Sequence, residues 1–134
     1  MAKTKEPLLT KSIDFTDLEG EMDKALMAYG RYAEKTAKHL NQLSWSRWAR
    51  DKRKAELWLI FKEEVGDNGR YLSNDAVEHS ITEDDKYQEI YEDYLEDKNK
   101  YEQSLAISTA LNTRLEVLRT AMATQRVEMQ AHLK

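Results

Sequence analysis

The chain contains no cysteine, a single proline (Pro7) and only four glycines among 134 residues. Without cysteine it can form neither a disulfide framework nor a cysteine-ligated metal site, which suits a reducing, intracellular setting. Proline and glycine are the strongest breakers of regular structure. Their scarcity therefore predicts long, uninterrupted helices.

Long apolar runs are also missing. No stretch approaches the ~20 apolar residues that a membrane-spanning helix requires. The beginning of the sequence, MAKTKEPLLTK, lacks the apolar segment of a secretory signal peptide. We therefore expect a cytoplasmic protein.

Signatures of catalysis are absent as well. There is no G-x-S-x-G motif and no glycine-rich phosphate loop, so nucleophilic catalysis and nucleoside-triphosphate chemistry have no support. All-helical nucleotide pyrophosphohydrolases bind Mg²⁺ through EExxE and ExxD pairs on adjacent helices. Here Glu63-Glu64 is followed by a loop glycine, and Glu89, Glu92 and Asp93 have no matching pair upstream. We expect no enzymatic activity, no cofactor and no metal.

Charge is abundant and unevenly distributed. Charged residues make up 34% of the chain, and the net charge is −4. Residues 1–62 carry 13 Lys/Arg against 9 Asp/Glu, residues 63–104 carry 4 against 14, and residues 105–134 carry 4 against 2. These blocks are either solvated helix faces or surfaces for different partners, and the acidic block could meet the basic segment of a neighbouring copy.

The hydrophobic pattern predicts an all-α fold. Residues 1–13 resemble a flexible leader. A long helix, with a bend possible at Ser44 and Ser46, is expected over residues 16–65, opened by the capping box Thr16 to Glu19. Gly66 is placed to end this helix at its C′ position.

The second half of the chain is expected to hold a short helix and another long one. Residues 66–82 read as a loop and a short helix capped by Ser73 or Asn74, and residues 83–132 as the final helix opened by Thr82. Tyr87 and Tyr94 begin a heptad-like seam with polar interruptions, which is typical of helix packing.

Helix length then bears on assembly. About 50 helical residues at ~1.5 Å each would span ~75 Å, whereas a compact domain of this size is only ~35–40 Å across. The apolar seams are thin. We therefore expect one elongated helical domain over residues 1–134 that completes its core by homo-oligomerisation.

The stretch SWSRWARDKRKAELWLIFKEE, residues 44–64, holds all three tryptophans and the densest basic run. Aromatic rings stack on bases and cations meet phosphates, so the stretch could bind single-stranded nucleic acid. The candidate residues are Arg47, Arg50, Lys52, Arg53, Lys54, Trp45 and Trp48. The alternative is structural: tryptophans as core or interface anchors beside solvated cations. Trp45 and Trp48 are undecided between the two, whereas Trp58 reads as structural.

The layout resembles a known family. One long helix ends in a Lys-Ala-x-Leu plus aromatic run, here residues 54–58, and is followed by a Gly/Asp loop at residues 66–69, an acidic linker and a final long helix. Over residues ~13–130 this is similar to the UvsY recombination mediators of T-even bacteriophages. In that family a Lys-x-Arg pair on the first long helix is implicated in DNA binding. Lys54 matches the lysine, but Glu56 replaces the arginine, so Arg47, Arg50, Lys52 and Arg53 should carry more of any DNA binding.

The resemblance implies a ring-forming homo-oligomer that binds single-stranded DNA in the cytoplasm of a phage-infected cell. It would help to displace single-strand-binding protein and load a RecA-like recombinase, without catalysis of its own. The alternative hypothesis is a non-catalytic helical scaffold or adaptor, such as a phage assembly or inhibitor protein, whose tryptophans bury against a protein partner.

Overall fold

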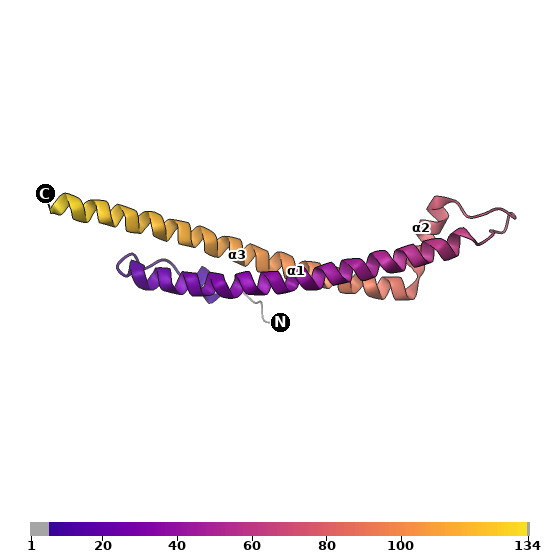
Figure 1. Ribbon diagram of the computed structural model, residues 1–134, viewed down its shortest axis with the longest axis horizontal. Helices are drawn as coiled ribbons and strands as arrows, with labels where there is room; N and C mark the ends of the chain where they lie inside the picture. Colours follow the sequence, from indigo (N-terminus) through magenta and orange to yellow (C-terminus); the bar gives the residue numbers. More distant parts are fainter. Residues whose placement is uncertain (1–5, 134) are drawn as a thin grey trace. The chain divides into compact units, whose positions relative to one another are not determined.

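The computed structural model describes residues 6–133, and over them the chain is helical apart from short connections (Figure 1). The elements are the 3-10 helix η1 (Pro7–Thr10), the long helix α1 (Leu18–Lys62), the short helix α2 (Asn74–Glu83) and the long helix α3 (Asp85–His132). α1 and α3 pack antiparallel. The predicted all-α fold, two long helices with a short connecting helix, is confirmed. Homo-oligomerisation stays a prediction.

The chain divides into two compact units. Unit 1 combines the residues up to Lys38 with those from Glu102 onward, and unit 2 is His39–Tyr101. Each unit therefore contains one segment of α1 and one of α3. α2 belongs entirely to unit 2.

In unit 1 the core forms where small residues of α1 meet leucines of α3. Ala25 packs with Leu115 and Leu118, and Ala28 packs with Leu111. All five side chains are almost completely buried. The alanines bring no bulk beyond Cβ, so the leucines fill the space between the two helices at close range.

The segment before α1 packs on unit 1 in the part that the structure describes. Glu6 is buried and forms an ion pair with Arg31 at 3.3 Å, and Leu8 contacts both apolar clusters of the unit. Arg114 of α3 donates a hydrogen bond to the carbonyl of Lys11 at 2.8 Å. The sequence predicts a flexible leader over residues 1–13; its residues from 6 onward instead have these defined contacts, and residues 1–5 lie outside the described range.

Both long helices begin later than the sequence predicts, because aspartates cap them. Thr16 does not cap α1: its hydroxyl donates to Asp14 and lowers the pKa of that carboxyl, with help from the Thr16 N–H. Asp17 caps instead, accepting the N–H of Gly20 at 3.1 Å. At α3 the predicted cap Thr82 donates to the carbonyl of His79. Asp84 takes its place.

α1 continues without interruption through residues 41–46. The Ser44 hydroxyl donates to the carbonyl of Leu40 within the helix, and Ser46 donates to Asp97 of α3. Serine hydroxyls often compete with helical hydrogen bonds, but here one binds the turn before it and the other a neighbouring helix. The helix is therefore not broken at the two serines.

The second core lies in unit 2, where α2 packs on the end of α1. Leu57, Val77 and Ile81 are buried together, with Trp58 and Phe61 against them. Ser73 caps α2 by accepting the N–H of Ala76 at 3.2 Å, as the sequence predicts. Tyr94 of the predicted tyrosine seam is buried and Tyr87 and Tyr101 are half-buried, which confirms that the seam is packed.

The loop between α1 and α2 is closed by a turn. α1 ends at Lys62, and Val65 and Tyr71 then form an antiparallel bridge. The prediction that Gly66 ends the helix as a left-handed C′ residue is wrong: Gly66 starts the turn, and Gly69 is the residue with positive φ, +75°. Glycine adopts this conformation without the steric cost that other residues meet.

Asp84 connects α1 with the start of α3 in unit 2, and its loss should destabilise the protein by about 2 kcal/mol. Its carboxylate accepts the N–H of Tyr87 at 2.8 Å, which caps α3, and three hydrogen bonds from the Arg53 guanidinium at 3.1 to 3.2 Å. Losing a cap costs ~1 kcal/mol, and the half-buried ion pair adds to this. Urea denaturation of Asp84→Ala measures the change. Thr82→Ala is the matched control, expected within ~0.5 kcal/mol of the parent; an equal loss in both variants would contradict this role.

Candidate nucleic-acid interface

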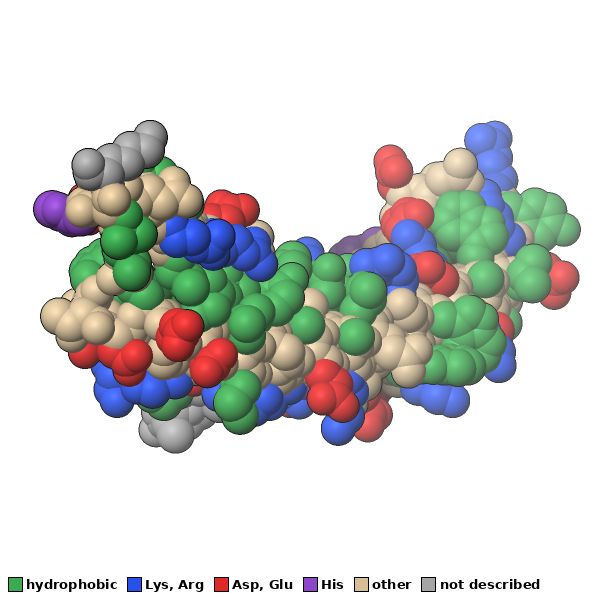
Figure 2. Space-filling model, turned by 60° about the vertical axis from the view of Figure 1, so that its left-hand side comes forward, with side chains coloured by type: hydrophobic (Ala, Val, Ile, Leu, Met, Phe, Trp, Pro, Cys, Tyr) green, Lys and Arg blue, Asp and Glu red, His purple; other side chains and the backbone are tan. Residues whose placement is uncertain are grey.

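Within unit 2, α1 has one face turned to the rest of the unit and one turned to solvent. The inner face repeats at spacings of three and four: Leu43, Ser46, Arg50, Arg53 and Leu57. The outer face has the same spacing and is exposed: Trp45, Trp48, Lys52, Ala55 and Leu59. We call this outer set the tryptophan face. Figure 2 shows hydrophobic side chains on the molecular surface among charged ones.

Two exposed indoles dominate the tryptophan face. Trp45 is 64% exposed and Trp48 56%, and their ring centroids lie 6.0 Å apart in an edge-to-face arrangement. The ammonium group of Lys52 lies 5.0 Å from the centre of the Trp48 ring. The core interpretation of Trp45 and Trp48 is therefore excluded within the subunit. Their exposed rings are available for stacking or for a partner protein.

Two of the five candidate cations lack an acidic partner. Among residues 6–133, neither Arg47 nor Lys52 has a carboxylate within 4 Å, and both are exposed. Arg47 flanks the tryptophan face one residue before Trp48, and Lys52 lies within it. Both charges are open to an anionic ligand.

Arg50 points inward. Its guanidinium lies 4.2 Å from the centre of the Tyr94 ring of α3 and contacts Asp51 at 3.0 Å. Burial by itself would lower the pKa of Arg50, but the hydrogen bond and charge of Asp51, together with those of Tyr94, outweigh it. The pKa of the guanidinium is therefore raised above its usual value.

Arg53 and Lys54 are paired with acids from other elements. Arg53 contacts Asp84, between α2 and α3, and also lies 3.7 Å from Glu56 of α1. Lys54 lies 3.6 Å from Glu78 of α2. The glutamate at the position of the family's arginine is thus the partner of an arginine in this chain. The structure does not bring the five cations onto one face.

Exposed apolar surface extends the tryptophan face toward the end of α1. Leu59 is 69% exposed and Ile60 is exposed beside it. A hollow of about 530 Å³ is lined by Ala55, Trp58 and Leu59 together with Asp51 and Lys54. The apolar run at residues 57–61 predicts burial either between elements or at a subunit contact. Only Leu57 is fully buried, so the remainder of the run leaves an apolar surface.

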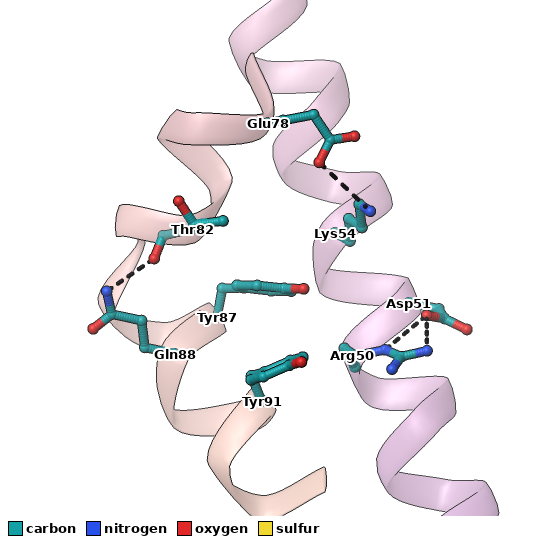
Figure 3. A pocket seen from close by; sticks show the side chains of 8 residues that line it. All are labelled: Arg50, Asp51, Lys54, Glu78, Thr82, Tyr87, Gln88 and Tyr91. Carbon is teal, nitrogen blue, oxygen red and sulfur yellow. Dashed lines mark hydrogen bonds and ion pairs between the residues drawn. The ribbon is translucent and has the colours of Figure 1, made fainter. Parts of the chain in front are cut away.

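A second hollow lies between α1, α2 and the beginning of α3 (Figure 3). It has a volume of about 620 Å³. Tyr87 and Tyr91 extend from α3 toward α1 with ring centroids 6.0 Å apart, and the amide of Gln88 donates to the carbonyl of Thr82. Tyr91 lies outside the heptad seam, and its spacing of four from Tyr87 was the available signal. The two cations of the hollow are each paired with one of its acids, which leaves no net charge to attract an anion.

Residues 6–133 offer neither a metal site nor a membrane-spanning segment. No group of three or more His, Asp or Glu side chains in this range is arranged to hold a metal ion. None of the helices there is both long and apolar enough to cross a membrane. Comparisons of the chain with models of protein families, with curated proteins and with solved structures found no match.

Proposed function

We propose that the chain binds single-stranded DNA on the tryptophan face of α1. The observation that carries the proposal is the exposed Trp45–Trp48 pair, with Lys52 over one ring and Arg47 beside it, both cations lacking an acidic partner in the described residues. Stacking on an indole accepts any base, and the two cations meet neighbouring phosphates. The site therefore favours single strands over duplex, in which the base faces are hidden.

The biological role that fits this activity is that of a cytoplasmic recombination mediator. It would help to load a RecA-like recombinase onto DNA coated by single-strand-binding protein, and it would catalyse no reaction itself. This role rests on the family resemblance of the sequence. Two free cations make a weak site in one copy, so several copies would bind side by side along one strand.

A second candidate is a helical adaptor that binds a protein partner. The exposed Leu59 and Ile60 and the hollow beside Trp58 favour it, because contiguous apolar surface on a soluble protein commonly marks a protein interface. The two candidates differ in salt dependence. Binding carried by phosphate contacts weakens steeply as salt rises, whereas apolar burial does not.

The test is a titration of fluorescently labelled oligo-dT at several salt concentrations. Each phosphate contact contributes ~0.7 to the slope of log affinity against log salt for single strands, so Arg47→Gln/Lys52→Gln should lower the slope by ~1.4 for each bound copy. Arg119→Gln/Arg126→Gln, on an exposed part of α3, makes the same change in net charge and should leave the slope unchanged. No binding by the parent chain, or equal slopes in both variants, would overturn the proposal.

A further inference from the structure

A second exposed face in unit 2 has the opposite charge. On α3, Glu89, Glu92 and Glu96 recur at spacings of three and four, with the exposed Leu95 beside them. We call these four residues the acidic face. Glu96 pairs with Lys100 at 3.2 Å, but neither Glu89 nor Glu92 has a Lys or Arg within 4 Å in the part of the chain that the structure describes.

Neither face is covered within its own subunit. The tryptophan face lies opposite the side of α1 that contacts α3. The acidic face lies opposite the side of α3 that carries the buried Tyr94 and the half-buried Asp97. The two faces of one copy therefore point away from each other inside the unit and cannot meet. Any contact between them must join two copies.

The two faces are complementary in length and chemistry. Lys52 lies seven positions after Trp45, and Glu96 lies seven positions after Glu89, so each face extends over about 10 Å of helix. One presents indoles and cations, whereas the other presents a line of carboxylates and a leucine. The acids next to the tryptophan face, Asp51 and Glu56, are occupied by arginines of their own helix and do not cancel Lys52. Complementary charge of this kind selects the partner and its register.

We propose that the acidic face of one copy docks on the tryptophan face of the next and competes there with single-stranded DNA. This rests on the proposed function, because the acidic face would occupy the DNA site by presenting carboxylates where phosphates would lie. Each copy offers one face of each kind, so the contact is head-to-tail and can repeat into a ring or a filament. Single-stranded DNA would bind the tryptophan face only when these contacts between copies dissociate.

The first measurement is sedimentation velocity of the full chain at low and high salt, with and without oligo-dT. The parent chain should associate at low salt and dissociate both at high salt and with stoichiometric oligo-dT. Glu92→Lys/Glu96→Lys should weaken association at least tenfold and should not weaken oligo-dT binding. Glu116→Lys/Glu128→Lys, in exposed positions of the same helix, is the matched control and should associate like the parent.

Mixing two association-deficient variants tests the head-to-tail geometry. Trp48→Ala damages only the tryptophan face, and Glu92→Lys/Glu96→Lys damages only the acidic face. Each variant alone should be monomeric, and an equimolar mixture should form a one-to-one complex that grows no further. Circular dichroism of each variant reports whether its helices are intact, and the milder Glu89→Gln/Glu92→Gln should weaken association in the same direction.

The outcomes separate this inference from the proposed function. A parent chain that binds oligo-dT but is monomeric at every salt concentration overturns the inference and leaves the DNA proposal standing. The same holds if oligo-dT binds without dissociating the assembly, or if the mixture stays monomeric. A chain that associates in a salt-sensitive way but never binds oligo-dT overturns the DNA proposal together with the competition.

Discussion

Replacing Arg114 with methionine is expected to destabilise the protein by about 3 kcal/mol, roughly a 100-fold shift in its unfolding equilibrium. Arg114 and Glu21 form an ion pair at 3.0 Å inside unit 1, and each side chain is only 10% exposed. Methionine fills a similar volume but leaves the Glu21 carboxylate buried without a cation. The buried carboxylate would then be desolvated without a cation to compensate for the lost hydration. Urea or thermal denaturation followed by circular dichroism measures the loss.

The double variant Glu21→Leu/Arg114→Met supplies the control. It removes both charges and fills the space with apolar groups, so it should recover to within about 1 kcal/mol of the parent. Arg119→Met, an exposed position on the same helix, should change stability by no more than ~0.5 kcal/mol. If Arg114→Met is as mild as Arg119→Met, or if the double variant is as unstable as the single one, the pair has no special role in the fold.

The long helices could be predicted from the sequence because their cause is local. Few breakers and sustained apolar spacing fix helix type and approximate length without knowledge of any distant contact. The first residue of each long helix is harder to predict from the sequence. Thr16 and Thr82 have the residue type of a cap, but Asp17 and Asp84 stand nearby with equal capping ability. At Asp84 the choice is reinforced by Arg53, a residue 31 positions away, and sequence spacing carries no information about that contact.

The candidate site shows the same division between local and distant causes. The concentration of cations at residues 47–54 is visible in the sequence, and so is the shared face of Trp45, Trp48 and Lys52. Contacts from α2 and α3 determine which of these cations keep an unpaired charge. α2 brings Glu78 to Lys54, and α3 brings the ring of Tyr94 to Arg50. Periodicity likewise groups residues onto one face without saying whether that face is inside or outside. Two faces of α1 have identical spacing, and only packing distinguishes them.

Because only two of the five candidate cations are unpaired, the largest loss of DNA affinity is expected from substituting the two exposed tryptophans. Trp45→Ala/Trp48→Ala is expected to weaken oligo-dT binding at least 30-fold, because stacking on an aromatic side chain contributes ~1–3 kcal/mol for each base. Both rings are exposed and contribute little to the core, so the stability of the double variant should stay within ~0.5 kcal/mol of the parent. Anisotropy of labelled oligo-dT is the measurement, since it does not depend on the tryptophan signal that the substitutions remove.

Tyr71→Ala is the matched control for this loss. Tyr71 is an exposed aromatic residue of the same unit, in the loop after α1 and away from the tryptophan face. Its removal should leave DNA affinity unchanged. Equal affinities in Tyr71→Ala and Trp45→Ala/Trp48→Ala would show that the indoles do not stack on bases. If the tryptophan variant kept its DNA affinity and lost only self-association or a protein partner, the exposed rings would be interface anchors, and the adaptor candidate would replace the mediator.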